Sequence, residues 1–356
     1  MTDHEAYIAF NLVPDVGSVK VDALAKSHGS VAAAWEAFPE KKDWRGQPVD
    51  WRAELDRAGR MHVTVVTCDD SLYPAALNDL PSRPLALYVV GDPSALSKPS
   101  IAMVGTRHPT LYGTDMAERF ASGIVRGGLS VVSGLATGID AESHKGALKA
   151  GGVTVGILGG SLDRFFPEEN RELGRRIVAA GGAVASEYPF GFPPGKKTFP
   201  QRNRIVAALA CGVLAVEAPI PSGTLITCTF AKELGRKLMA IPANLDSVNS
   251  AGCWKLIREG ATMVTSPEDV VALCGGKSQV ASSAPFPMSA PQAPKPQLTL
   301  EEAAILRAIP STGITLDRLA FAVKLPAAKV GDVTMSLRLK RLIRFLPGNR
   351  VAPAKK

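Results

Sequence analysis

Short loops of glycine and hydroxyl residues follow several apolar runs in the central part of the chain. Their polar members are Gly105, Thr106 and Arg107 in one loop, Ser133 and Gly134 in a second, and Ser222, Gly223 and Thr224 in a third. Glycine lets backbone N–H groups approach a ligand, and a helix that starts at such a loop directs its positive dipole end at an anion. One such loop is ordinary in a strand-to-helix turn, but several of them predict a phosphate-binding rim.

Basic residues lie close to these loops. Arg107 follows Gly105 by two positions, where a guanidinium can grip a phosphate with two hydrogen bonds. The other polar residues that we expect to contact the ligand are Lys145, Lys196, Lys197, Arg202, Asn203 and Arg204. We expect Arg202 to Arg204 in a first helical turn, where cations oppose the helix dipole unless an anion is bound. The alternatives are a salt bridge for Arg107 and a solvated face for the charge run.

Three phenylalanines, Phe165, Phe166 and Phe199, lie beside these basic segments. Aromatic rings next to cations are typical of surfaces that stack the bases of single strands. Packing in the core is the ordinary role of a phenylalanine taken alone. We predict that Phe166 contacts the ligand.

The sequence contains no catalytic constellation. Asp140, Asp163 and Glu217 each follow a predicted strand, but spacing pairs none of them with a nucleophile or base. His144 comes four residues after Asp140, and we expect a hydrogen bond at the helix start rather than acid–base chemistry. Neither GxGxxG nor GxxxxGK[ST] occurs, so ATP and NAD are not favoured. The histidines and cysteines lack metal-ligand spacing, so we predict no metal and no cofactor.

Alternating apolar and helix-like segments must position these loops. Apolar runs with β-branched residues predict strands over 101–104, 129–133, 153–158, 183–187, 212–218 and 237–242. Helix-like segments lie between them over 114–126, 140–150, 168–180, 201–210 and 224–234. Short strands that are apolar on both faces suit a parallel sheet covered by helices. We therefore predict an α/β fold, an extended Rossmann-like doubly wound parallel sheet that binds ligands beyond the carboxyl ends of its strands.

The charge of the chain is unevenly distributed. Its 356 residues carry a formal net charge of +8, yet residues 1–100 hold 10 basic against 14 acidic side chains. Residues 101–275 hold 18 basic against 15 acidic ones, and residues 298–356 hold 11 against 4. We therefore expect a polyanionic partner to contact either a few cations at specific positions in the central part or the basic C-terminal part, because the chain does not have a uniformly basic surface.

Composition excludes several classes of protein. The hydrophobic share of 46% excludes wholesale disorder. The longest central run without charge or proline, 205–216, is shorter than the roughly 20 residues that span a bilayer. The first residues carry acids where a signal peptide carries bases, and the cysteines are scattered, as in reduced proteins. We predict a cytoplasmic protein without a membrane segment.

The chain divides into parts by composition. Residues 1–90 indicate a small helical domain, and residues 91–275 the Rossmann-like core that carries the site. Residues 276–297, rich in Pro, Ala and Ser, indicate a linker. Residues 298–356 indicate a C-terminal winged-helix domain, with helices over 301–309, 316–323 and 327–341 and a hairpin over 345–351. Its basic residues, which suit contact with either DNA or protein, are Arg338, Lys340, Arg341 and Arg344.

The central region resembles the DNA-processing protein A family (DprA, also called Smf). The stretches that carry the resemblance are IAMVGTRHPTLYG, VVSGLATGIDAESHKGAL, TVGILGGSLDRFFPEENREL, SEYPFGFPPGKKTFPQRNRIVAALA and VLAVEAPIPSGTLITCTFAKELGRKLMAIP. The resemblance implies a homodimer, not an enzyme, that binds single-stranded DNA in a basic pocket. It also implies loading of the recombinase RecA onto that DNA during natural transformation and recombination. The pocket role would fall on Gly105 to Arg107, Ser133 and Gly134, Arg202 to Arg204, and Ser222 to Thr224.

The sequence departs from the family pattern at a few positions. Ala243 stands where a glycine is usual, and Trp254 where an asparagine is usual. The N-terminal region is similar to a helix-hairpin-helix (or SAM-like) domain, but Asp15 replaces the expected hairpin glycine. Because this region is acidic, we expect it to pack or bind protein rather than DNA.

Two other functions stay open at this stage. A Rossmann-like nucleotide hydrolase would use Glu217 as its carboxylate beside the loop of Ser222, Gly223 and Thr224. A transcription regulator would bind duplex DNA through the winged helix.

Overall fold

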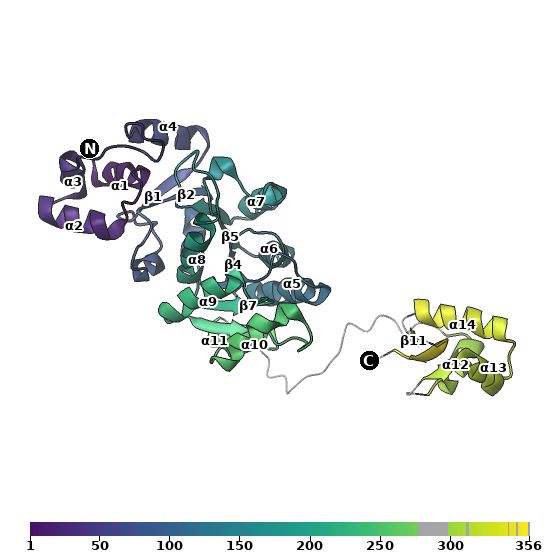
Figure 1. Ribbon diagram of the computed structural model, residues 1–356. Coiled ribbons are helices and arrows are strands. Elements are labelled where there is room, and N and C mark those ends of the chain that lie inside the picture. Colours follow the sequence, from purple (N-terminus) through teal and green to yellow (C-terminus); the bar gives the residue numbers. More distant parts are fainter. Residues whose placement is uncertain (277–297, 311–312, 341, 347, 355–356) are drawn as a thin grey trace. The chain divides into compact units, whose positions relative to one another are not determined.

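The structure is a computed structural model of the chain, and it describes residues 1–276, 298–310, 313–340, 342–346 and 348–354. The chain forms two compact units, Met1–Gln279 and Val280–Lys356 (Figure 1). Apart from Gly276, the predicted linker over 276–297 lies outside the described residues.

A nine-stranded sheet forms the first unit. Its strands are β1 Thr64–Thr67, β2 Ala86–Gly91, β3 Ser100–Val104, β4 Ser130–Ser133, β5 Thr154–Ile157, β6 Ala183–Ser186, β7 Gly212–Ala215, β8 Lys237–Ala240 and β9 Thr262–Met263. They lie in the order β1-β2-β6-β5-β4-β3-β7-β8-β9. The seven strands from β6 to β9 in this order are parallel to one another. Strand β2 is antiparallel to both of its neighbours, β6 and β1. The chain builds outward from β3 to β6 and then crosses to β7, so the switch point lies between β3 and β7.

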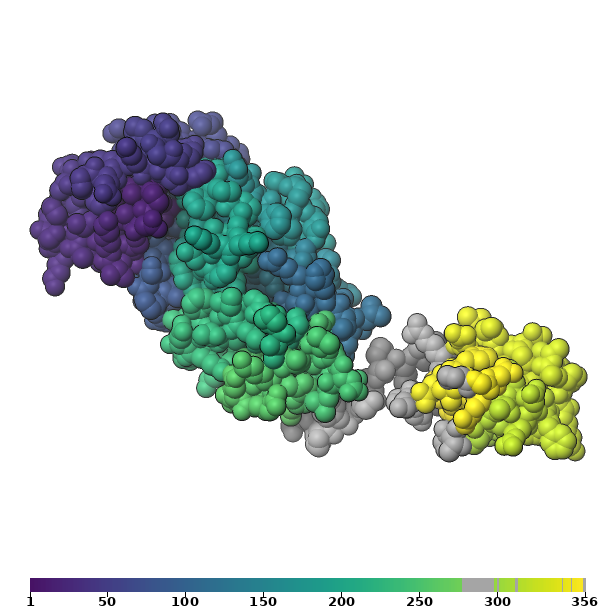
Figure 2. Space-filling view, viewed as in Figure 1, coloured from purple at the N-terminus to yellow at the C-terminus, as the bar shows by residue number. Residues whose placement is uncertain are grey.

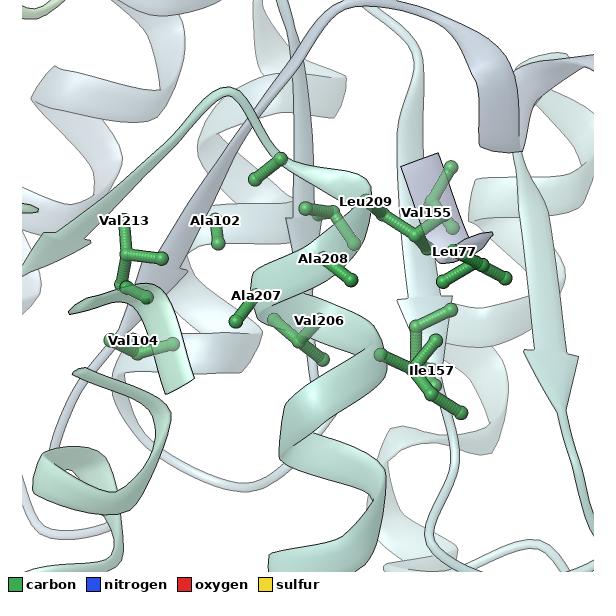
Figure 3. Packing of buried hydrophobic residues seen from close by; sticks show 14 of the residues in the cluster. Leu77, Ala102, Val104, Val155, Ile157, Val206, Ala207, Ala208, Leu209 and Val213 are labelled. Atoms are coloured by element: carbon green, nitrogen blue, oxygen red, sulfur yellow. The ribbon is translucent and has the colours of Figure 1, made fainter. Parts of the chain in front are cut away.

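Helices cover both faces of this sheet. They are α5 Leu111–Arg126, α6 Ile139–Lys149, α7 Arg171–Ala179, α8 Thr198–Leu209, α9 Gly223–Glu233, α10 Ala251–Arg258 and α11 Pro267–Leu273. Successive side chains of β3 point to opposite faces, so Ala102 packs in the cluster that contains α8 and Ile101 in the cluster that contains α5. Figure 3 shows Val206 of α8 among the side chains of the strands. The predicted extended Rossmann-like, doubly wound sheet is confirmed.

Helix α8 begins at Thr198, not at Gln201 as the sequence predicted. The proline-rich sequence predicts a loop through Pro200, but proline is tolerated in the first turn of a helix, where the backbone N–H groups have no partner within the helix. Arg202 therefore lies beyond the first turn, and Lys197 stands at the helix N-cap. The prediction that Arg202 to Arg204 oppose the dipole in the first turn is wrong.

The N-terminal region is helical, as predicted. Its helices are α1 Asp3–Leu12, α2 Ser18–His28, α3 Val31–Ala37 and α4 Trp51–Arg60. They enclose a small core in which the rings of Phe10 and Trp35 meet edge to face, with centroids 5.1 Å apart. Asp15, between α1 and α2, has a φ of 58°, a left-handed conformation that aspartate tolerates better than most residues. This explains how it stands where a glycine was expected.

The N-terminal helices pack against the sheet-bearing part of the first unit, as their purple surface in Figure 2 shows. Strand β1 precedes residue 90, β2 includes it, and β2 pairs with β6 in the main sheet. The division of the chain at residue 90 stays a prediction.

The second unit is a winged helix. It consists of α12 Leu300–Ala308, α13 Leu316–Val323, α14 Ala327–Leu339 and the strands β10 Ile314–Thr315, β11 Ile343–Leu346 and β12 Arg350–Pro353. Leu319, Val330 and Leu337 are buried in its core together with Val351 of the hairpin. The helical pattern of the sequence and the predicted winged helix are therefore confirmed.

Helices α5 and α6 approach each other closely at Gly146, which a mutation can test. A Cβ there would lie 2.6 Å from the Glu118 carbonyl oxygen. Alanine in a helix interior is normally up to about 1 kcal/mol more stable than glycine, but a backbone oxygen cannot move aside. We expect Gly146→Ala to lower the free energy of unfolding by about 1–3 kcal/mol in urea denaturation. The control is Gly59→Ala in α4, where the Cβ meets open space; a similar loss in both variants would contradict the close packing.

Candidate functional site

A cavity of about 440 Å³ opens at the carboxyl ends of β3, β4 and β7, at the switch point of the sheet. Doubly wound sheets bind their ligands in this crevice. The predicted site residues that line it are Gly105, Thr106, Arg107, Gly134, Lys196, Arg202, Asn203, Ser222, Gly223 and Thr224. A smaller cavity of about 100 Å³ shares Arg107, Gly134 and Arg202 with it and is also lined by Phe166. The structure thus brings most of the predicted residues together.

Backbone hydrogen bonds join the loops around the cavity. The Thr106 amide donates to the Glu217 carbonyl at 2.8 Å, which ties the loop after β3 to the loop after β7. The Ile139 amide donates to the Thr106 carbonyl at 3.1 Å, which ties the same loop to the start of α6. Gly138 has a φ of 74°, and a Cβ there would lie 2.4 Å from the Thr106 oxygen, so this contact requires glycine.

The guanidinium of Arg202 is buried beneath the cavity, and only 5% of the residue is exposed. It donates hydrogen bonds to the carbonyls of Gly134, which follows β4, and Ile157, in β5. A Cβ at residue 134 would lie 2.4 Å from the guanidinium, so only glycine leaves room for it. Arg202 therefore joins α8 to the ends of two strands and positions the cavity wall.

Asp140 balances the charge of Arg202. Its carboxylate accepts hydrogen bonds from the amides of Gly134 (3.1 Å) and Ala136 (3.4 Å), the helix-start arrangement expected from the sequence. Burial raises the pKa of Asp140, and the attraction of Arg202 opposes that rise. Burial likewise lowers the pKa of Arg202, and Asp140 opposes that change.

His144 takes no part in acid–base chemistry with Asp140. Burial, followed by the charge of Arg202, lowers the pKa of His144 to about 3, so the ring is neutral at physiological pH. Its Nδ1 lies 2.7 Å from the Thr154 hydroxyl. The ring is therefore part of the core beneath α6.

Arg107 and Lys196 are exposed cations at the cavity. The Arg107 guanidinium carbon lies 5.2 Å from the centre of the Phe199 ring. The Phe166 ring, in a residue that is 48% exposed, lies 5.8 Å from the same ring. Within the described ranges neither Arg107 nor Lys196 forms an ion pair, so the alternative of a salt bridge for Arg107 is not realised there.

Other predicted residues lie outside both cavities. Ser133 is buried, and its hydroxyl donates to a carbonyl of β3 at 2.6 Å. Lys145 forms an ion pair within α6 at 2.8 Å. Lys197 is exposed at the start of α8, and Arg204 forms an ion pair with Glu187. These residues are close to the loops in the sequence, which is why they were predicted to contact the ligand. In the structure their side chains do not line the cavity.

Glu217 lies behind the cavity, not in it. Its carboxylate accepts hydrogen bonds from the amide (2.9 Å) and the hydroxyl of Thr110, the N-cap of α5. A Cβ at Gly113 would lie 2.3 Å from this carboxylate, which is 1% exposed. A carboxylate in this position stabilises a helix N-terminus. It does not reach a ligand in the cavity.

Some residues of the lining were not predicted from the sequence. His108 and Asp140 also line the cavity, and no local pattern marked His108. Phe199 carried a signal, since it lies beside the basic loop, but only Phe166 was predicted to make contact. Two of the departures from the family pattern touch each other, because the Trp254 indole N–H donates to the Ala243 carbonyl at 3.1 Å. Neither of them lines the cavity.

Potential metal ligands gather elsewhere in the part of the chain that the structure describes. His4, Asp69 and Asp70 offer ligand atoms within 4.8 Å of one another, but they are not part of the cavity. Among the same residues, no helix has the length and apolar character needed to cross a membrane. The cysteines are free thiols.

Comparison with known proteins agrees with this geometry. Residues 64–275 match the model of DNA recombination-mediator protein A, and residues 289–349 match that of the DprA winged helix domain. The chain belongs to the DNA recombination-mediator protein A family. The resemblance seen in the sequence is therefore confirmed, and the family is one of DNA-processing proteins.

Individual members of the family show how far the similarity extends. Protein Smf of Synechocystis sp. is 35% identical over 287 residues, which are 76% of this chain and 72% of the relative. The X-ray structure of DNA processing protein A from Streptococcus pneumoniae matches with a TM-score of 0.63 and 31% identity, over 76% of this chain and 98% of that one. DNA processing protein A from Helicobacter pylori, which binds single-stranded DNA, matches with a TM-score of 0.53 and 30% identity, over 59% and 95%.

Arg202→Met tests the two opposite charges that are buried beneath the cavity. Without the guanidinium, Asp140 is a buried carboxylate without a cation, so we expect the free energy of unfolding at pH 7 to fall by about 3–5 kcal/mol. The pKa of Asp140 is raised in the folded protein, so its ionisation opposes folding as the pH rises through that value. The loss should be smaller at pH 4 than at pH 7 in chemical denaturation. Adding Asp140→Asn should recover part of it at pH 7; equal losses at both pH values would show that Asp140 is not involved.

Proposed function

We propose that the cavity at the switch point binds single-stranded DNA. The observation that carries the proposal is the Arg107 guanidinium, unpaired among the described residues, over the ring of Phe199 at a glycine-lined cavity. Phosphates of the strand meet Arg107 and Lys196, and the glycine loops let the backbone approach the same groups.

The aromatic rings favour a single strand over a duplex. Phe166 and Phe199 stack on a base only where that base is not paired and stacked within a helix. The single-stranded DNA binding of the Helicobacter pylori relative supports this assignment. Because Arg202 and Asp140 offset each other, the positive charge that the strand meets comes from the exposed cations.

We also propose that the protein is a cytoplasmic homodimer that loads RecA onto the bound strand during natural transformation and recombination. The resemblance to the family supports these partners. In this proposal the protein holds DNA without changing it covalently, so catalytic residues are not assigned.

The arrangement does not favour a nucleotide hydrolase. The hydrolase considered above would use Glu217 beside the ligand, whereas this carboxylate is bound to the N-terminus of α5. Ser222 caps α9 by accepting from the Thr224 amide at 3.1 Å. Free base released from nucleoside monophosphates, with loss of this turnover in Glu217→Gln, would reverse this conclusion.

The winged helix offers duplex DNA fewer unpaired cations than the sequence predicted. Lys340 forms an ion pair with Glu302 at 2.7 Å, and the Arg338 guanidinium lies 5.3 Å from the ring of Phe345. Arg341 lies outside the described residues. One of the basic residues that were to contact DNA, Lys340, thus has an ionic partner within the domain.

Arg107→Ala tests the cavity directly. We expect the affinity for a fluorescein-labelled oligonucleotide to fall about tenfold, and the salt dependence to become shallower by about 0.7 in slope, the value of one phosphate contact on a single strand. Fluorescence anisotropy at several salt concentrations measures both quantities. The control is Arg119→Ala, which removes an exposed arginine of α5 outside the cavity. Unchanged affinity and slope in Arg107→Ala would remove this residue from the interface.

Removal of residues 276–356 separates the cavity from the basic tail. The deleted part holds 13 basic against 4 acidic side chains, so the remaining chain is slightly acidic. We expect the truncated protein to keep most of its single-strand affinity, because placed cations at the cavity supply it. A competition with duplex DNA should leave the single strand bound in both proteins. Loss of nearly all binding on truncation would assign the DNA to the winged helix instead.

A further inference from the structure

Two cysteines of the first unit meet at the amino end of β7. Cys211 directly precedes this strand, and Cys274 is the C-cap of α11. The Cys211 sulfur lies 3.9 Å from the Cys274 carbonyl oxygen, although 63 positions separate the two residues in the sequence. A Cβ at Gly212, next to Cys211, would lie 2.8 Å from the Cys274 sulfur, so the glycine leaves room for this thiol.

The surroundings hold both side chains in place. The two cysteines pack against the same hydrophobic cluster, to which α11 contributes Val270 and Val271. In its thiol form Cys211 also donates a hydrogen bond to the Ser100 carbonyl oxygen at 3.0 Å. Both residues are only half-buried, so a small oxidant can reach them from the solvent. The sulfurs are therefore already close together before any reaction takes place.

The pair also has the reactivity that oxidation requires. A thiolate attacks an oxidant, whereas a protonated thiol reacts slowly. A hydrogen bond between the two thiols is the largest influence on both groups: it lowers the pKa of Cys211 to about 7 and raises the pKa of Cys274. A large share of Cys211 is therefore ionised at neutral pH, next to a Cys274 thiol that keeps its proton.

The other three cysteines lack this reactivity. Burial raises the pKa of Cys228 and of Cys253 to about 12, and it raises the pKa of Cys68 to about 11. All three thiols are therefore protonated at neutral pH. An oxidant that enters the solution reacts first with the pair at β7.

We propose that Cys211 and Cys274 form an intramolecular disulfide when the protein meets hydrogen peroxide. The Cys211 thiolate attacks one peroxide oxygen, so that an S–O bond forms, the O–O bond breaks and hydroxide leaves. The Cys274 sulfur then attacks the sulfenic acid of Cys211; the S–S bond forms, the S–O bond breaks, and the leaving hydroxide takes the proton of Cys274 to become water. In total the two thiols lose two electrons and two protons, and the peroxide is reduced to two water molecules.

The disulfide joins the last helix before the described part of the first unit ends to the central strand β7. Without it, α11 is held by packing alone, as where Val271 lies against Gly127 at the end of α5. Disulfides of cytoplasmic proteins are usually transient and sense the redox state, and thiol reductants reverse them. The cavity proposed for DNA lies at the carboxyl ends of the same strands, so this proposal does not rest on the function proposed above.

Mass spectrometry of the full-length protein tests the proposal. The protein is treated with hydrogen peroxide at neutral pH, free thiols are blocked with iodoacetamide, and the product is digested with trypsin. We expect peptides 205–232 and 259–277 to be linked, with a mass lower than their sum by two hydrogen atoms. Fragmentation then locates the bond between Cys211 and Cys274, and dithiothreitol added before the blocking step removes it.

Two variants tie the result to this pair. In Cys274→Ser the linked peptides should be absent, and dimedone, which labels sulfenic acids, should label Cys211. The matched control is Cys68→Ser, which removes another half-buried cysteine and should form the disulfide as the parent protein does. In the parent protein we expect this disulfide to exceed any other pairing of cysteines at least tenfold.

Urea denaturation shows whether the bond fits the native fold. Tryptophan fluorescence follows the first unit, because all four tryptophans of the chain lie in it. A link between residues 211 and 274 restricts the unfolded chain, so we expect oxidation to raise the urea midpoint by on the order of 1 M. Dithiothreitol should reverse the shift, and Cys274→Ser should not show it.

Several outcomes would overturn the proposal. One is that Cys211 and Cys274 stay reduced after the peroxide treatment, and another is a disulfide that joins two molecules instead of forming within one. A urea midpoint that does not rise on oxidation would overturn the link within the native fold. Failure of the reduced protein to bind an oligonucleotide would overturn the function proposed above and leave the disulfide unaffected.

Discussion

The shape of the candidate site depends on one buried guanidinium. Arg202 on α8 holds the carbonyls of Gly134 and Ile157, which lie where β4 and β5 end. Burying a cation costs several kcal/mol unless it is paired and hydrogen-bonded, and Asp140 supplies the opposite charge. The helix is thereby fixed against the edge of the sheet. The position of the helix in turn fixes the residues on its other faces, including Phe199, whose ring lies under Arg107.

The basic residues near the site fall into two groups, those with a carboxylate partner in the fold and those without one. Only the second group is free to bind an anion. In the first group each arginine lies near a carboxylate of the same fold: Arg202 near Asp140, and Arg204 in an ion pair with Glu187. These residues stabilise the fold and present little net charge to a ligand. Arg107 and Lys196 have no such partner among the described residues and stand at the cavity opening. An anion that enters the cavity can therefore bind these two cations without first breaking an ion pair. The formal charge of the whole chain says little about this, because it counts both groups alike.

Periodicity made the fold predictable, because short apolar strands alternate with helix-like segments along the sequence. The strands around Ile101 and Val213 appear in the structure nearly where the pattern placed them. The loops of the site were predictable for the same reason, since parallel strands all end at one edge of the sheet. What the pattern could not supply was long-range pairing. Nothing near Glu217 in the sequence indicates that its carboxylate binds Thr110.

The direction of side chains on α8 shows where local reasoning stops. Each residue turns a helix by about 100°, so positions 202 and 204 must point to different sides. The sequence grouped Arg202, Asn203 and Arg204 as one basic segment of a single site. In the structure the rotation assigns Arg202 and Asn203 to one cavity and Arg204 to another, at the carboxyl end of β6. Which side faces which cavity depends on the anchoring of the helix by Gly134, a glycine whose missing Cβ makes room for the guanidinium. A glycine that follows β4 thus makes room for the guanidinium that fixes α8, and the rotation of that helix divides its basic residues between two cavities.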